Sequence, residues 1–236
     1  MHVHSDPPIT PASFLLARRP LLIALAVLLG ALAVAAAVAN GQLLLTWDEP
    51  IQRGVEANRT SDMDTFFTWI SRFGSTIPVL VLGTLAAILT WRRCPAVGVA
   101  IAAATVSRPL IEFTLKATVD RSRPDLERMV PGNGPSFPSG HVMAAVALWG
   151  LLPAVVALYT QRRALWWASV GVAGSLIVGI AASRVYLGVH WFTDVTAGLV
   201  VGAFFLLGVE IVFHRAHTRI PCRLAVAPAL VRRRRR

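Results

Sequence analysis

Long apolar stretches constrain the fold of this chain more than any other feature. An apolar stretch of about twenty residues is what an α-helix needs to cross the hydrocarbon core of a bilayer. Backbone polar groups must also be paired inside lipid, and a helix pairs them within itself. The sequence therefore predicts an all-α fold: a polytopic membrane protein built as a six-transmembrane-helix bundle. The predicted spans are residues 21–38, 77–91, 96–115, 141–159, 164–182 and 191–213.

The composition agrees with this class. Hydrophobic residues make up 55% of the chain and charged residues only 15%, whereas a soluble domain is about 25% charged. We expect one six-span domain over residues 18–214, a disordered cytoplasmic tail over 1–17 and an Arg-rich cytoplasmic tail over 215–236. The first span ends in small residues, as a signal peptide does. It exceeds the roughly 7–15 apolar residues of such a peptide, so we expect it to be retained.

Basic residues gather on one side of the predicted membrane. If the six spans alternate in direction, four Arg clusters share the side of the two termini, which the positive-inside rule makes cytoplasmic. We therefore predict a multi-pass protein of the cell inner (plasma) membrane with both termini in the cytoplasm. The net charge of +11 then reflects contact of the Arg-rich tail with anionic lipids rather than binding to nucleic acid. The clusters are Arg18-Arg19, Arg92-Arg93, Arg162-Arg163 and the tail with Arg232 to Arg236.

Several cations nevertheless fall on the opposite, exoplasmic side. They lie near the loops after the third and fifth spans, where the orientation rule disfavours them. A site for an anion on this side would explain their presence. Arg121 and Arg128, with Asp125 and Glu127, are expected to meet a lipid headgroup or water. The cations on this side are Lys116, Arg121, Arg123, Arg128 and Arg184.

The connection over residues 41–76 is expected to be mostly a polar loop on the exoplasmic side. Its middle, residues 63–70, carries bulky apolar groups. These groups suit either a segment lying at the membrane interface or a plain loop with some buried aromatic side chains. Both readings leave the segment outside the bundle of spans.

Three short motifs fall on the exoplasmic side and suggest a phosphate site. Lys116, Arg123 and Arg184 could place three positive charges around one tetrahedral anion, and arginine forks suit phosphate oxygens. The motifs are Lys116 with Arg123-Pro124 seven residues later, Pro138-Ser139-Gly140-His141, and Ser183-Arg184 followed by His190 and Asp194.

The second motif is expected to open a helix. Ser139 suits the N-cap position, and Gly140 lets the backbone approach a ligand closely. The free N–H groups and the dipole of a helix N-terminus favour an anion. This arrangement would place a phosphate at the helix end with His141 beside it.

The third motif supplies a reactive pair. If residues from Trp191 onward are helical, His190 and Asp194 lie four residues apart on one face. Asp194 can then hold the His190 imidazole in the orientation that a nucleophile needs, while His141 protonates the leaving oxygen. A His–Asp pair at a helix start is often only a cap, so the inference depends on all three motifs meeting on one face.

Together the motifs resemble the signature of the type 2 phosphatidic acid phosphatase family, which includes bacterial isoprenyl-diphosphate phosphatases. They run from Lys116 to Asp194, and the six-span layout extends the resemblance over about residues 21–213. Vanadium haloperoxidases share the signature but are soluble and larger. Sugar-phosphate phosphatases of the endoplasmic reticulum also share it, whereas this short chain looks bacterial. Residues of the first outer loop that look like bacterial members are Asp48, Arg59-Thr60 and Gly74-Ser75.

The resemblance implies an integral-membrane, metal-independent phosphatase that hydrolyses a lipid phosphate or isoprenyl diphosphate through a phosphohistidine intermediate. His190 would be the nucleophile, Asp194 would orient it, and His141 would be the general acid. It implies no metal or other cofactor, in agreement with the lack of a carboxylate cluster in the motifs. The residues expected to bind phosphate are Lys116, Arg123, Ser139, Gly140 and Arg184.

Other interpretations stay open at this point. A membrane transporter for an anion or a lipid phosphate could use the same cradle without hydrolysing anything. Among phosphatase substrates, phosphatidic acid, phosphatidylglycerol phosphate and undecaprenyl diphosphate all present phosphate at the bilayer surface, so the motifs do not choose among them. The sequence also specifies no oligomeric state.

Arg108, Glu112 and Lys116 form a charged stripe on the third span. Their spacing of four residues allows them to stack along one helix face, and charges inside a span are costly and often functional. We expect Glu112 to neutralise Arg108 and to help position Lys116, or else to form a purely structural pair.

Overall fold

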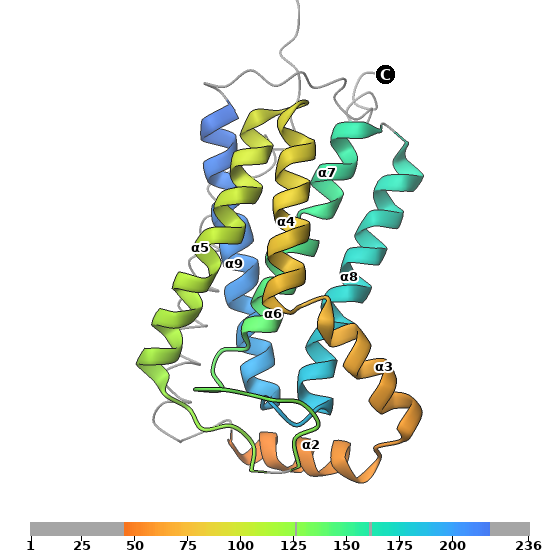
Figure 1. The fold of residues 1–236 in the computed structure, drawn as a ribbon, viewed down its shortest axis with the longest axis vertical. Coiled ribbons are helices and arrows are strands. Elements are labelled where there is room, and N and C mark those ends of the chain that lie inside the picture. The colour runs from red at the N-terminus through yellow and green to blue at the C-terminus, as the bar shows by residue number, and fades with distance from the viewer. Residues whose placement is uncertain (1–44, 126, 161, 218–236) are drawn as a thin grey trace, which may run out of the picture.

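The computed structural model describes residues 45–217, apart from residues 126 and 161. Within that part of the chain, the regular elements are all helices, and they form one elongated bundle (Figure 1). The all-α prediction is therefore confirmed for these residues. The helices are α2 (Leu45–Ala57), α3 (Ser61–Arg72), α4 (Thr76–Trp91), α5 (Pro95–Val119), α6 (Gly140–Trp149), α7 (Leu152–Tyr159), α8 (Arg163–Tyr186) and α9 (Phe192–His217).

Among the described residues, four stretches of helix are long and apolar enough to cross a membrane. They are α5, α6 continued by α7, α8, and residues 192–209 of α9; a fifth arises if α3 and α4, bent by 46°, count together. Large apolar side chains such as Ile77, Val106 and Phe113 point outward and are about 70% exposed or more, as lipid-facing residues would be. The predicted first span, the predicted N-terminal tail and residues 218–236 of the predicted C-terminal tail lie outside the described residues, so the six-span count stays a prediction. α9 itself continues to His217, into the first residues of the predicted C-terminal tail.

The connection before α4 is helical, which corrects the expectation of a mostly polar loop. α2 lies across one end of the bundle, and α3 rises obliquely from it to the start of α4 (Figure 1). The Thr60 hydroxyl caps α3 by accepting a hydrogen bond from Met63 N at 3.4 Å. Phe66 and Trp69, one turn apart on α3, are each 58% exposed, so the bulky apolar groups of this segment do face outward.

The predicted span 141–159 is interrupted, because α6 ends at Trp149 and α7 begins at Leu152. Pro153 in the first turn of α7 has no N–H to continue the hydrogen-bond ladder. Gly150 at the break lies so close to α9 that an added Cβ would be 2.6 Å from Leu206. The interruption therefore follows from a proline and a close helix contact.

The connection between the last two predicted spans, 164–182 and 191–213, is shorter than expected. α8 continues through Ser183 and Arg184 to Tyr186, so this connection begins as helix. The chain reverses at Gly188, whose φ of 73° lies in the left-handed region that glycine adopts at little cost. A Cβ there would also lie 2.7 Å from the Glu127 carbonyl oxygen. Helical geometry therefore fixes the direction of the Arg184 side chain.

α6 is the central helix and packs against α4, α5, α8 and α9. Its Val142 forms a buried cluster with Ala181, Val185 and Val195, to which Ile51 and Val55 of α2 add their side chains. This cluster joins the N-terminal half of α6 to α2 and to the facing ends of α8 and α9. It fixes the end of the bundle at which the three motifs meet.

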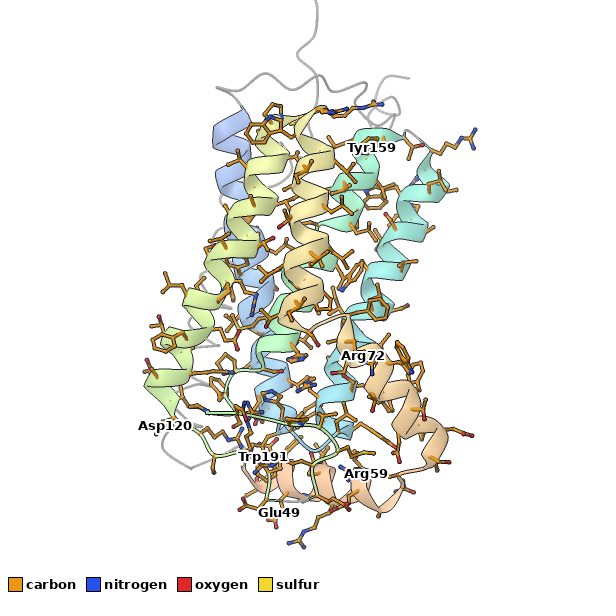
Figure 2. The ribbon with its side chains drawn as sticks, viewed as in Figure 1. Glu49, Arg59, Arg72, Asp120, Tyr159 and Trp191 are labelled. Atoms are coloured by element: carbon orange, nitrogen blue, oxygen red, sulfur yellow. The ribbon has the colours of Figure 1, made fainter. Side chains whose placement is uncertain are left out.

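The two ends of the bundle differ in chemistry. Figure 2 shows Asp120, Trp191 and Arg59 at the end covered by α2, and Tyr159 at the opposite end. Arg93 stacks on the Tyr159 ring, 5.0 Å from its centroid, so the Arg92-Arg93 and Arg162-Arg163 clusters share that opposite end. The predicted separation of these Arg clusters from the motif residues is confirmed.

Candidate active site

Asp194 is fully buried in the first turn of α9 and contacts three groups. Its Oδ1 accepts a hydrogen bond from Arg121 Nη1 at 2.6 Å, and its Oδ2 accepts one from Trp191 N at 2.9 Å. The same Oδ2 lies 3.6 Å from His190 Nδ1. Asp194 therefore caps α9 and faces His190 at the same time, so the two interpretations of this pair are compatible.

His190 lies between Asp194 and Arg123. Arg123 Nη1 is 3.3 Å from His190 Nε2, and because a guanidinium can only donate, Nε2 must be the acceptor. The ring proton is then on Nδ1, on the Asp194 side. At 3.6 Å the Nδ1 atom is beyond hydrogen-bond distance, and it has no other partner among the described residues. This tautomer leaves the lone pair on Nε2.

Burial lowers the pKa of His190 to about 4. Asp194 opposes this shift by favouring the imidazolium, while the charges of Arg184 and Arg123 add to it. The folded pKa is thus below the ordinary value of about 6.5. His190 is therefore neutral near pH 7 and becomes protonated only as the pH falls through about 4.

Arg123 holds the loop between α5 and α6 against the turn before α9. Its Nε and Nη2 donate to the carbonyl oxygens of Asn133, Gly134 and Pro135, and its Nη1 donates to Val189 O at 2.6 Å. With the His190 contact, all five N–H groups have a partner. Arg123 was predicted to bind phosphate as an arginine fork, and here it could do so only by exchanging one of these contacts.

Ser139 and Gly140 stand at the N-terminus of α6, as predicted. Ser139 is the N-cap residue but its side chain makes no capping hydrogen bond, in contrast to the expected cap. Its hydroxyl is buried and has no partner among the described residues. The backbone N–H of Ser139 donates to Asp194 O at 3.0 Å, which ties the start of α6 to α9.

His141 follows in the first turn of α6 and is partly buried. Its Nε2 lies 3.3 Å from the hydroxyl of Ser75, the N-cap residue of α4. The charges of Arg184 and Lys116 act on this ring, as does His190. The two motif histidines are therefore brought into one electrostatic environment from different helices.

The predicted stripe on α5 is confirmed. Glu112 accepts hydrogen bonds from Arg108 Nη1 through Oε2 and pairs with Lys116 Nζ through Oε1 at 2.9 Å. Arg108 Nη1 also donates to Gly140 O at 3.3 Å. A Cβ at Gly140 would lie 2.0 Å from Glu112 Oε1. The stripe therefore touches the mouth of α6, and Lys116 is held by Glu112.

Arg184 is buried on the last turn of α8 and is 4% exposed. Its Nη1 donates to the Ser71 hydroxyl at 2.6 Å, while its Nε has no partner among the described residues. Its carbonyl oxygen accepts hydrogen bonds from His190 N and Val189 N. The Arg184 guanidinium and the Ser139 hydroxyl are thus buried donors with capacity for an anionic oxygen.

Sequence reasoning missed two residues of this site. Arg121 was expected to meet a headgroup or water, but it is only 8% exposed and bonds both Asp194 and Asp48. Asp48 was noted only as a feature of bacterial relatives, yet it is 1% exposed. The available signal was an arginine two residues before Arg123 on the side where arginine is disfavoured.

These observations define a helical membrane protein with a buried histidine and basic side chains gathered at one end of the bundle. The model of the PAP2 superfamily matches residues 94–218, more than half of the chain. The protein belongs to the PAP2 superfamily, and the resemblance stated from the three motifs is confirmed.

Relatives with known names agree with this assignment. Phosphatidylglycerophosphatase B of Bacillus subtilis is 28% identical over 183 residues, which are 74% of this chain and 88% of that protein. The crystal structure of a transmembrane PAP2 type phosphatidylglycerolphosphate phosphatase from Bacillus subtilis matches with a TM-score of 0.69 and 26% identity. That match covers 81% of this chain and 96% of the other. The crystal structure of Aquifex aeolicus LpxE resembles this chain in fold, with a TM-score of 0.52 and 20% identity. That match covers 71% of this chain and 94% of the other.

The titration of His190 can be measured directly. In protein labelled with ¹³C-histidine, we expect one imidazole signal, absent in His190→Asn, to titrate near pH 4. Burial opposes its protonation, so it should stay neutral at pH 6. Histidine in an unstructured model peptide, whose pKa is about 6.5, serves as the reference. A midpoint at or above 6.5 for His190 would contradict the geometry given above.

Proposed function

We propose that this protein is a lipid phosphatase in which His190 attacks the phosphorus atom of a membrane lipid phosphate. The observation that carries the proposal is the neutral, buried His190, whose Nε2 lone pair lies beside the Arg123 guanidinium and whose opposite nitrogen faces Asp194. Membership of the PAP2 superfamily and likeness to named phosphatases support it.

The proposed first step joins His190 Nε2 to phosphorus and breaks the bond from phosphorus to the lipid oxygen. Asp194 stabilises the imidazolium character that develops on His190, and His141 donates a proton to the departing oxygen. In the second step His141 takes a proton from water, which attacks the phosphohistidine and releases inorganic phosphate and free His190. Each bond formed is matched by one broken, and no metal is required.

We propose that the phosphate is bound by Lys116, Arg123, Ser139, Gly140 and Arg184. The Ser139 hydroxyl and Arg184 Nε support this, since both are buried donors without a protein acceptor among the described residues. The N-terminus of α6 adds free N–H groups and the positive end of its dipole. Arg123 would give up its His190 contact to a phosphate oxygen as Nε2 forms its bond, and Lys116 would loosen from Glu112. Such donors stabilise charge that develops in the transition state.

The two histidines can be tested by substitution. We expect His190→Ala to abolish phosphate release from a lipid phosphate, because the nucleophile is lost. His141→Ala should lower kcat by about 10²–10⁴-fold, the usual contribution of a general acid. Phosphate release by protein purified in detergent measures both. His214→Ala, on the last turns of α9 at the opposite end, is the matched control. EDTA should have no effect and vanadate should inhibit; turnover retained by His190→Ala would contradict the mechanism.

The substrate we favour is phosphatidylglycerol phosphate, because a sequence match and a structure match, both from Bacillus subtilis, carry that lipid in their names. Purified protein tested against phosphatidylglycerol phosphate, phosphatidic acid and undecaprenyl diphosphate should give the highest kcat/KM with the first. A higher value for undecaprenyl diphosphate would overturn this choice. Binding of a lipid phosphate without release of phosphate would instead favour the alternative that the protein is a transporter for an anion or a lipid phosphate.

We further propose that the end of the bundle with Arg93 and Tyr159 faces the cytoplasm, so that the candidate site faces the exoplasmic side of the inner membrane. The positive-inside rule supports this orientation. Because α9 runs from the site to the opposite end (Figure 1), a green fluorescent protein fused to the C-terminus should fluoresce. Alkaline phosphatase fused at the same point should be inactive. If an N-terminal fusion also fluoresces, the span count is even, as six spans require. Active alkaline phosphatase at the C-terminus would reverse the orientation.

A further inference from the structure

We propose that Asp48 of α2 and Arg121 of the loop after α5 form a buried ion pair that positions Asp194. The same pair determines how strongly the negative charge of Asp194 acts on His190. Both are positioning residues that act through Asp194. The inference rests on the proposed function in one respect: it takes His190 as the reacting group. It assigns α2, a helix outside the three motifs, a part in the reaction.

Arg121 bridges the two carboxylates. Its Nη1 donates to Asp194 Oδ1 and its Nη2 donates to Asp48 Oδ2, each at 2.6 Å. Arg121 Nη1 also donates to the Thr193 hydroxyl at 2.7 Å. Such short contacts to two charged partners are typical of charge-assisted hydrogen bonds. The guanidinium therefore fixes the plane of the Asp194 carboxylate from the side opposite His190.

Asp48 is tied to the same helix start. Its Oδ1 accepts a hydrogen bond from Thr193 N at 2.9 Å, and its Oδ2 accepts the Thr193 hydroxyl. N–H groups in the first turn of a helix have no partner within the helix. Asp48, which belongs to α2, thus caps α9 at Thr193, the residue directly before Asp194. A shift of Asp48 would move both Arg121 and the turn that carries Asp194.

Three buried charges then act together. Two carboxylates and one guanidinium leave one negative charge in a region where all three side chains are at most 8% exposed. If Arg121 faced Asp194 alone, the pair would be neutral, and Asp194 would do little to stabilise a charged His190. Because Arg121 also pairs with Asp48, its positive charge does not fully compensate that of Asp194. The carboxylate of Asp194 can therefore still stabilise positive charge on the His190 imidazole. Interactions between charges are strong in such a low-dielectric setting.

α2 is anchored firmly enough to hold Asp48 in place. Gln52, one turn after Asp48 and fully buried, donates from Nε2 to Val185 O of α8 at 3.0 Å. Ile51 and Val55 pack onto the apolar cluster shared by α6, α8 and α9. Asp48 is therefore part of the bundle, although α2 lies across its end. The other charged or titratable groups that interact with His190 are Arg123, Arg184 and His141, which the test leaves unchanged.

Three variants of the full chain test the inference: Asp48→Asn, Arg121→Gln and the double variant. In ¹³C-histidine spectra, Asp48→Asn should lower the pKa of His190, because Arg121 is left without its counter-charge. Arg121→Gln should raise that pKa, because both carboxylates then act unopposed. The double variant should return toward the wild-type value. A merely structural role of Asp48 predicts no such opposite shifts.

Turnover gives an independent readout. Asp48→Asn should lower kcat by about 10²-fold, the effect of a small misplacement of reacting groups, with KM unchanged because no phosphate contact is altered. In an Asp194→Asn background, Asp48→Asn should have no further effect. Asp64→Asn removes another carboxylate on the same side, one that accepts a hydrogen bond from Tyr186 at 2.7 Å. It is the matched control and should retain wild-type kcat.

Shifts of the His190 pKa in the same direction for both single variants would overturn the inference. So would an undiminished effect of Asp48→Asn in the Asp194→Asn background. If Asp48→Asn does not purify in folded form, Arg121→Gln decides alone, since an unchanged or lowered pKa there contradicts the proposal. The spectra require no turnover. A protein that hydrolyses no lipid would therefore refute the proposed function without deciding this inference.

Discussion

Pairing of buried charge organises the end of the bundle at which the site lies. Charges removed from water are tolerated only when partners surround them, and here the partners come from distant segments. Arg123 joins the loop before α6 to the turn before α9, and Arg121 joins α2 to α9. Arg59 does the same for the start of α3, because it donates to the carbonyl oxygens of Tyr186 and Glu127. Removal of any one arginine would leave several acceptors unpaired.

This network makes the site rigid. Arg123 has a partner for every N–H group, and its contact with His190 Nε2 holds the ring in one tautomer. In the proposed function a phosphate oxygen would replace one of these contacts, and the Arg123 side chain is already ordered before the phosphate arrives. Ser139 and Arg184 differ from Arg123, because each keeps a buried donor free of protein partners among the described residues. The site therefore contains two kinds of hydrogen-bond donor. Those of Arg123 already have protein acceptors, whereas Ser139 and Arg184 each retain a donor to which an anion could bind.

Much of the fold was predictable because lipid imposes a simple rule on composition. α5, α8 and α9 agree with the predicted spans 96–115, 164–182 and 191–213 to within four residues at each end. The prediction failed where tertiary contacts decide. α2 and α3 were expected to be mostly loop because their polar residues obscure an amphipathic pattern. Arg184 was placed in the connection after the fifth span because the apolar run ends at residue 182. The motifs predicted that the two histidines lie at the same end of the bundle, but their spacing could not show that the Arg121 side chain faces inward.

The contact between Gly140 and Glu112 has a consequence for how this sequence can change. A side chain at position 140 would collide with the Glu112 carboxylate, so glycine is required there by a residue on another helix. Glu112 in turn holds Arg108 and Lys116, so it cannot be shortened without releasing two cations. Positions 108, 112, 116 and 140 are therefore expected to vary as one unit among related sequences. A larger residue at 140 should appear only where the charged stripe of α5 has been replaced as a whole.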